Sequence, residues 1–251
     1  MARDFDGSTQ HGTATAPVTA TPITIVFWAH LDAIDGVAVA LLRNTVGQFW
    51  GWYVDFTGTS VRAVVADNNS FAVASQTTVS TGTWHHCGGV FASTTSRTAY
   101  LDGSAGTEET TSKTPSDVTG LALSTAARVL DSGVGNWVNG RLAEIALYDV
   151  ALTAGEMSSL SKGVSPLKIR PASLVFYAPF MGRYSPEIEV ITNKVVTLTN
   201  APTQSNHPRI IYPRSRWMRR FTTASAAANA MLLLAPPNLR GNVNRLHGGF
   251  I

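Results

Sequence analysis

The feature that most constrains the fold of this chain is a series of short runs in which every second residue is apolar. The longest run, at residues 23–31, places these side chains on one face: Ile23, Ile25, Phe27, Ala29 and Leu31. Such a period of two is typical of a β-strand with one buried face. Further strand-length runs lie at 37–42, 48–56, 60–66, 71–78, 84–91, 98–102, 121–124 and 138–148. Turn-forming pairs such as Asp35-Gly36 separate them, so the sequence predicts an all-β, antiparallel sandwich.

One short helix interrupts this pattern. Thr153, with Glu156 three positions later, forms a capping-box sequence at a helix start. Met157 and Leu160 then share one helical face, and Gly163 ends the segment. We therefore expect a single helix after the last strand of the sandwich.

Length and composition limit the classes of protein that remain. A chain of 251 residues is long enough for one all-β domain with an extension. Cys87 is the only cysteine, so neither an intrachain disulfide nor a cysteine-based zinc site can form. The sequence shows no signal core at its start and no apolar stretch of about 20 residues. We expect a protein that is made and kept in a cytoplasm.

Charge is divided unequally along the chain. Residues 1–165 hold eight basic and fourteen acidic residues, a net charge of −6. Residues 166–251 hold eleven basic and two acidic residues, a net charge of +9. The tail is either a solvated segment or a docking arm for an acidic surface. The candidate docking residues are Arg209, Arg214, Arg216, Trp217, Arg219 and Arg220.

Several segments together resemble one family. They are Phe5-Asp6-Gly7, the run at 23–32, Trp84-His85-His86 with Tyr100-Leu101-Asp102-Gly103, the strand at 140–148 and the helix segment at 152–163. In this order they resemble the laminin-G-like, concanavalin A-like jelly-roll family. The resemblance implies a jelly-roll sandwich that serves as a binding or structural module. Phage-encoded proteins often carry such a module.

The chain departs from the family at its start. A segment that normally precedes the Phe-Asp-Gly motif is missing, and residues 173–180 and 195–202 resemble it. We expect residues 173–200 to supply strands to their own sandwich or to a neighbouring subunit. A separate small subdomain is the alternative. The predicted organisation is a jelly-roll body at 1–165, a strand-supplying extension at 166–212 and an extended arm at 213–251.

The motifs of catalysis are missing from the sequence. It has no Glu-x-Asp-x-x-Glu string, no Gly-x-Ser-x-Gly elbow and no phosphate-binding glycine loop. Cys87 lies mid-strand and is expected to pack in the core. His85 and His86 are neighbours on a strand, so their imidazoles point to opposite faces and are expected to be structural. We therefore predict that the protein is not an enzyme.

Two sets of residues are candidates for binding. Trp50 and Trp52 share one strand face, which stacks on a sugar ring if it is exposed and packs in the core if it is not. The family resemblance implies calcium at the rim of some relatives. The residues with suitable oxygen ligands are Asp4, Asp6, Asp67, Asn68 and Asn69, which are also ordinary turn residues. No other metal or cofactor is predicted.

These observations lead to three ordered hypotheses. The first is a non-enzymatic phage virion protein, a homo-oligomeric capsid decoration protein whose arm binds other virion proteins such as a major capsid protein. It would be assembled in the host cytoplasm, without membrane or nucleic-acid partners. The second is a carbohydrate-binding adhesion module of a phage tail or fibre. The third is a glycoside hydrolase.

Overall fold

The computed structural model describes residues 1–45, 48–130, 133–182 and 186–212, of which Met1–Tyr212 form one compact unit. The candidate docking residues Arg214, Arg216, Trp217, Arg219 and Arg220 lie outside the described residues. Arg209 is described, and its side chain is exposed.

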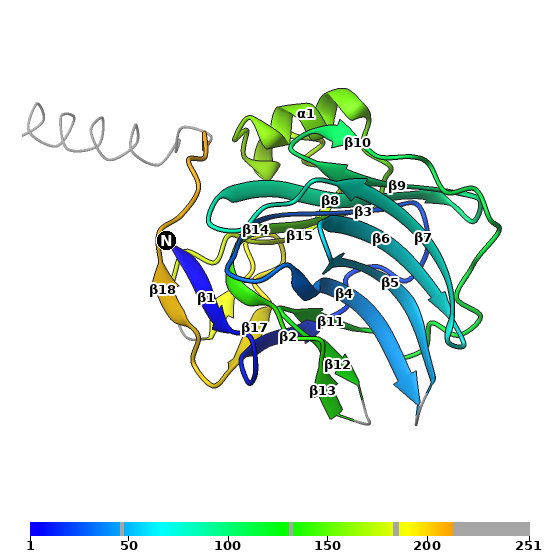
Figure 1. Ribbon diagram of the computed structural model, residues 1–251, viewed down its shortest axis with the longest axis horizontal. Helices are drawn as coiled ribbons and strands as arrows, with labels where there is room; N and C mark the ends of the chain where they lie inside the picture. Colours follow the sequence, from blue (N-terminus) through cyan, green and yellow to red (C-terminus); the bar gives the residue numbers. More distant parts are fainter. Residues whose placement is uncertain (46–47, 131–132, 183–185, 213–251) are drawn as a thin grey trace, which may run out of the picture. The chain divides into compact units, whose positions relative to one another are not determined.

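Two large antiparallel sheets form the sandwich (Figure 1). Sheet A has the order β10-β9-β8-β3-β14-β1-β18, with β15 also paired to β14. Its strands are β10 (Ser104–Ala105), β9 (Ser96–Leu101), β8 (Trp84–Ser93), β3 (Ile23–Leu31), β14 (Asn139–Tyr148), β1 (Ala2–Asp6), β18 (Thr203–Ser205) and β15 (Leu174–Ala178). These strands confirm the predicted all-β sandwich.

Sheet B has the order β16-β17-β2-β11-β4-β5-β6-β7. Its strands are β16 (Glu187–Ile188), β17 (Val195–Thr199), β2 (His11–Thr15), β11 (Ala122–Thr125), β4 (Asp35–Thr45), β5 (Gln48–Thr57), β6 (Ser60–Asp67) and β7 (Ser70–Thr77). A small hairpin, β12 (Arg128–Leu130) with β13 (Gly133–Gly135), completes the described strands.

The core lies between the two sheets. The alternating residues of β3 from Ile23 to Leu31 all face it, as the period of two predicts. From the facing sheet, β5 contributes Trp52, Val54 and Phe56. Burial of this apolar area supplies most of the stability of the sandwich.

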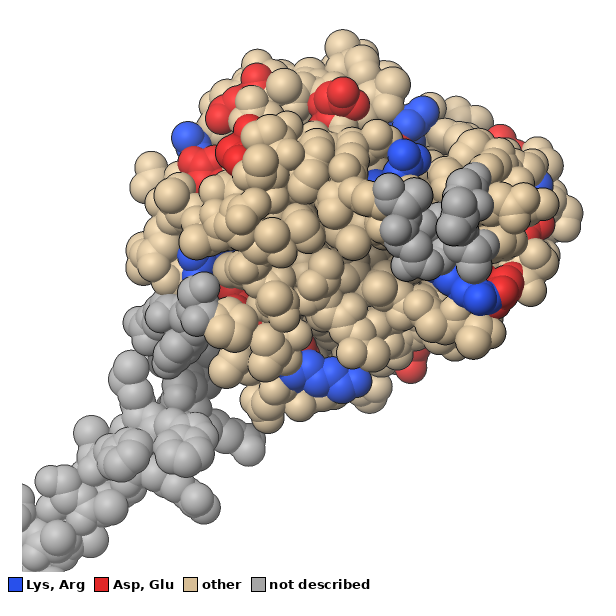
Figure 2. Space-filling model, turned by 90° about the horizontal axis from the view of Figure 1, so that it is seen from below, with Lys and Arg blue, Asp and Glu red and all other residues tan. Residues whose placement is uncertain are grey.

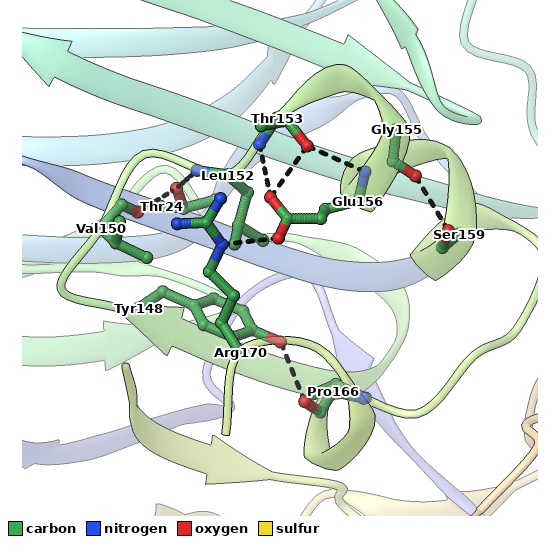
Figure 3. A network of polar contacts seen from close by, with 10 residues as sticks. All are labelled: Thr24, Tyr148, Val150, Leu152, Thr153, Gly155, Glu156, Ser159, Pro166 and Arg170. Carbon is green, nitrogen blue, oxygen red and sulfur yellow. Dashed lines mark hydrogen bonds and ion pairs between the residues drawn. The ribbon is translucent and has the colours of Figure 1, made fainter. Parts of the chain in front are cut away.

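The helix α1 (Ala154–Ser161) covers part of the outer face of sheet A. The Thr153 hydroxyl accepts the Glu156 backbone N–H, and the Glu156 carboxylate accepts the Thr153 N–H at 2.8 Å, which confirms the capping box. Glu156 also pairs with Arg170 at 2.5 Å (Figure 3). The Thr24 hydroxyl of β3 donates to the Val150 carbonyl and accepts the Leu152 N–H, so it ties the segment before α1 to sheet A. A short 3-10 helix, η1 (Pro166–Lys168), follows, and its Pro166 carbonyl accepts a hydrogen bond from the Tyr148 hydroxyl.

Strands after residue 166 pair with strands of the same chain. β15 pairs with β14, β17 pairs with β2, and β18 pairs with β1. Residues 166–212 therefore belong to the same compact unit as residues 1–165. Whether these strands also complete a neighbouring subunit stays a prediction.

Candidate functional site

The outer face of sheet A has two halves. Under α1, the side chains of Val26, Tyr148, Met157 and Leu160 form a buried apolar cluster. Beyond the helix, the same strands carry polar and aromatic side chains. Strand pairing sets Asp4 opposite Arg141, Arg141 opposite His30, and His30 opposite Trp84.

These four residues form one row across β1, β14, β3 and β8, which we call the Trp84 row. Its members alternate with core residues on each strand, so all four project outward. Neighbouring strands lie about 4.8 Å apart, so the row spans roughly 14 Å. None of the four residues is close to another in the sequence, and the register alone brings them together.

Contacts within the Trp84 row hold its polar members in place. The Arg141 guanidinium lies 3.3 Å from the Asp4 carboxylate through Nε and 3.4 Å from His30 Nε2 through Nη1. The His30 and Trp84 rings meet edge to face, with centroids 5.6 Å apart. Asp32, half exposed at the end of β3, lies 4.0 Å from His30 Nδ1. The row thus presents a carboxylate, a guanidinium, an imidazole and an indole in a fixed order.

A second aromatic pair lies beside the row. Trp28 faces His86 across β3 and β8, with ring centroids 5.5 Å apart in an edge-to-face arrangement. His86 is 2% exposed, and its burial lowers its pKa to about 4, although the nearby Asp102 charge opposes this shift. The imidazole is therefore neutral at neutral pH. Trp28 and Trp84 both stay partly exposed.

This half of the face has the chemistry of a binding surface for a polar ring. Partly exposed indoles offer apolar faces, while Asp4, Asp32 and Arg141 offer hydrogen-bond acceptors and donors within the same area. The three charged groups are of both signs, so the surface does not select strongly for an ion.

The outer face of sheet B differs. Tyr53, Val64 and Leu42 are buried there in an apolar cluster that Leu130 of the β12–β13 hairpin contacts. Seen from the side of this hairpin, the middle of the surface carries few charged side chains, and these lie mainly toward its margin (Figure 2). Phe71 remains exposed beside Phe49, with ring centroids 5.4 Å apart.

Of the two alternatives for Trp50 and Trp52, sugar stacking or core packing, the structure supports core packing. Trp52 is 2% exposed and packs in the core between the sheets, and Trp50 is only 9% exposed. Val54 and Phe56 continue the face that Trp50 and Trp52 share, and both pack in the core, so this face points toward sheet A. The missed signal was Trp28, which falls on the outward phase of the alternation at 23–31.

The residues considered for calcium are engaged in turns and pairs. Four donors from residues 8–10, among them the Thr9 hydroxyl at 2.6 Å, surround the Asp6 carboxylate. Desolvation opposes them, but these hydrogen bonds prevail and hold the pKa of Asp6 far below its ordinary value. Asp67 accepts the backbone N–H and the hydroxyl of Ser116.

Asn68 and Asn69 form the turn between β6 and β7 with φ of 49° and 60°. Asp4 belongs to the Trp84 row. Within the described ranges, no three His, Cys, Asp or Glu side chains are grouped so as to hold a metal ion.

His85 joins the β8–β9 hairpin to the preceding turn. Its Nδ1 lies 2.7 Å from an Asp102 carboxylate oxygen, and its Nε2 lies 2.9 Å from the Ser80 hydroxyl. This connectivity is that of a hydrolytic triad. However, the Thr83 hydroxyl and the Ser80 backbone N–H also converge on Nε2, at 3.1 and 3.3 Å. The imidazole therefore caps the turn at 80–83. Cys87, completely buried, has its pKa raised by desolvation and is a core thiol.

The helices of the described part are too short or too polar to span a bilayer. A search of curated proteins finds no match. Three solved structures resemble the chain at low identity. One is a candidate carbohydrate binding protein from Bacteroides ovatus, with a TM-score of 0.59, 14% identity, and coverage of 84% of this chain and 61% of that protein.

The second is the CBM40 of Ruminococcus gnavus IT-sialidase, solved with α2,3-sialyllactose, at a TM-score of 0.52 and 10% identity, covering 64% of this chain and 98% of the module. The third is domain 4 of AbnA, a GH43 extracellular arabinanase of Geobacillus stearothermophilus, solved with arabinotriose. It has a TM-score of 0.50 and 12% identity, with coverage of 64% of this chain and 76% of that domain. These likenesses support the fold.

The sequence itself matches the profile of Laminin_G_3, a family of the concanavalin A-like lectin/glucanases superfamily, over residues 5–158. This match spans more than half of the chain and includes the end of β1, all of β3, β8 and β14, and most of α1. The protein therefore belongs to the Laminin_G_3 family of the concanavalin A-like lectin/glucanases superfamily.

Proposed function

We propose that this protein is a non-catalytic glycan-binding module whose ligand lies on the Trp84 row. The observation that carries the proposal is the outward line of Asp4, Arg141, His30 and Trp84, with Trp28 beside it. The carbohydrate-binding modules among the similar structures support the class of ligand.

In the proposed mode of binding, the Trp84 and Trp28 indoles stack on the apolar faces of pyranose rings. The Asp4 and Asp32 carboxylates accept sugar hydroxyls, and Arg141 donates to ring or hydroxyl oxygens. Arg141 is already oriented by Asp4 and His30, so little side-chain entropy is lost when the ligand binds. The row contacts only one side of the ligand, so we expect a single site to bind weakly. Several copies of the module held together would bind a multivalent glycan strongly.

A glycan array followed by calorimetry tests this proposal. Trp84→Ala and Trp28→Ala are each expected to weaken binding of the best array ligand about tenfold or more, because stacking anchors of this kind dominate small interfaces. Trp137→Ala is the matched control. This tryptophan is also partly exposed, but it packs against His11, with ring centroids 5.5 Å apart, and is not in the row.

Melting temperatures of all three variants establish that the fold is kept. Binding that is unchanged in both Trp84→Ala and Trp28→Ala would remove the row from the proposal.

A second candidate function is that of a capsid decoration protein of a phage virion. The observation that favours it is the charge asymmetry, with a net +9 on residues 166–251 against −6 on residues 1–165. Replacement of Arg214, Arg216, Arg219 and Arg220 by serine would then abolish co-sedimentation with phage particles and leave glycan binding intact. Co-sedimentation that survives this replacement would exclude the arm as the anchor.

A further inference from the structure

One buried carboxylate connects the body to the end of the described chain. Glu144 lies in the β14 bulge with φ of 55° and is 1% exposed. The hydroxyls of Tyr177 and Tyr212 each donate to it at 2.6 Å, and His207 Nε2 lies 3.1 Å away. A buried charge is costly unless several donors surround it, so these contacts are mutually dependent.

Both tyrosines remain donors over a wide pH range. Desolvation, followed by the charge of Glu144, raises the pKa of Tyr177 and of Tyr212 well above its usual range. Tyr177 lies on β15 within the sandwich, whereas His207 and Tyr212 lie at the end of the described chain. We call residues 203–212 the strap.

The strap is held chiefly by directional contacts. Ser205 pairs with Ala2 in the β1–β18 register, and the Gln204 amide donates to the Gly182 carbonyl. At its far end, the Ile211 N–H donates to the Gly163 carbonyl at 2.7 Å. All of these contacts are made with elements outside the strap.

Apolar burial adds little to this attachment. Ile211 is 53% exposed and Tyr212 is 39% exposed, while Pro208 is buried. An open hollow of about 540 Å³ lies along the strap, and it is lined by Met1, Gln204, Ser205, Asn206 and His207. Because apolar burial is the main source of stability, the strap is held less firmly than the core strands.

The hinge that leads into the strap is strained. Asn200 and Ala201, consecutive residues between β17 and β18, have φ of 55° and 45°. The left-handed region is unfavourable for alanine because its Cβ crowds the backbone, and an extended hinge avoids this crowding. Short hinges under strain favour exchange of the segment that they connect.

We propose that the strap exchanges between two copies of this chain. Residues 203–212 of one copy then pair with β1 of the other and bring His207 and Tyr212 to its Glu144. Every polar contact of the strap is kept in the exchanged form, while the extended hinge relieves the strain at Ala201. A second copy is the partner that fits because the β1 edge, vacated by its own strap, offers the same register.

Cysteine pairing between chains tests the exchange. Ala2 and Ser205 are register partners, and neighbouring antiparallel Cα atoms lie about 4.5–5.5 Å apart, within the range of a disulfide. Full-length Ala2→Cys and Ser205→Cys chains are refolded together and oxidised. We expect a mixed disulfide dimer whose yield rises with protein concentration. Cys87 is fully buried and is kept in both chains.

The control is a body pair with the same geometry. Thr15 and Ala122 are exposed register partners on β2 and β11. Both strands stay in the body when the strap exchanges, so Thr15→Cys and Ala122→Cys chains should stay monomeric together. Ala201→Gly relieves the hinge and should lower the dimer yield about fivefold. The proposal fails if the mixed chains never cross-link while Ala2→Cys/Ser205→Cys closes within one chain. It also fails if the Ala2→Cys/Ser205→Cys double variant forms no disulfide between these two positions. A yield of mixed dimer from the Thr15→Cys and Ala122→Cys chains equal to that of the strap pair would overturn it as well.

Discussion

The two halves of the outer face of sheet A share strands but not chemistry. Under α1, β3 and β14 carry Val26 and Tyr148, which pack with Met157. A few residues farther along the same strands lie His30 and Arg141, on which α1, the α-helix of the described ranges, does not pack. The covered half contributes stability, whereas the open half keeps polar and aromatic groups that add little to a core. This difference identifies the open half as the place to expect a ligand.

The largest expected effect concerns the strands that complete both sheets. Deletion of residues 166–251 removes β15, β16, β17 and β18 and leaves β14 without the backbone pairing that β15 supplies. We expect the loss of most of the free energy of unfolding, of the order of 5–15 kcal/mol for a domain of this kind. Urea denaturation measures it. A truncated body as stable as the full chain would show that the extension is dispensable to both halves.

The covered half should respond to a core substitution without a change in binding. Leu160 is 2% exposed in the cluster beneath α1. Leu160→Ala is expected to lower the free energy of unfolding by about 2–5 kcal/mol. Glycan affinity, measured by calorimetry below the melting transition, should stay the same. A parallel loss of affinity would mean that the two halves are coupled.

Acid should weaken the fold through His86, at the border of the two halves. Its pKa is lowered from 6.5 to about 4 by burial, so the unfolded chain binds the proton more tightly. The stabilising effect of the neutral form is complete above about pH 6.5 and is lost as the pH falls toward 4. The maximal loss is of the order of 3 kcal/mol.

Denaturation curves from pH 7 to pH 4 measure this loss, with His86→Gln as the comparison. The variant is expected to be less stable at pH 7 and to lose less stability in acid. An equal acid dependence in the two proteins would assign the effect to other groups.

The smallest expected effect is that of the open half on stability. Trp84→Ala removes one edge-to-face contact with His30 and should cost about 1 kcal/mol. A loss as large as that of Leu160→Ala would instead make Trp84 a structural residue. Thermal melts of the two variants, run side by side, provide the comparison.

Local signals made much of the fold predictable from the sequence. The alternation at 23–31 identified β3 and its buried face, and Thr153 with Glu156 located the start of α1. The short strands β1 and β18 have too few residues for a clear pattern. Their pairing depends on contacts across most of the chain.

The candidate site was less predictable for the same reason. Alternation shows that Trp50 and Trp52 share a face, but not whether that face meets the other sheet. The Trp84 row depends on the register between strands that are far apart in the sequence, such as β1 and β14. Only the outward phase of Trp28 and His30 could be inferred from the local pattern.

The most direct test of the glycan-binding surface is a titration of the tryptophan indole N–H signals by nuclear magnetic resonance. The chain has six tryptophans, and single substitutions assign each signal. With the best array ligand, the signals of Trp28 and Trp84 should shift to saturation while those of Trp52 and Trp137 stay in place. Saturating ligand that leaves Trp28 and Trp84 unmoved would contradict the account.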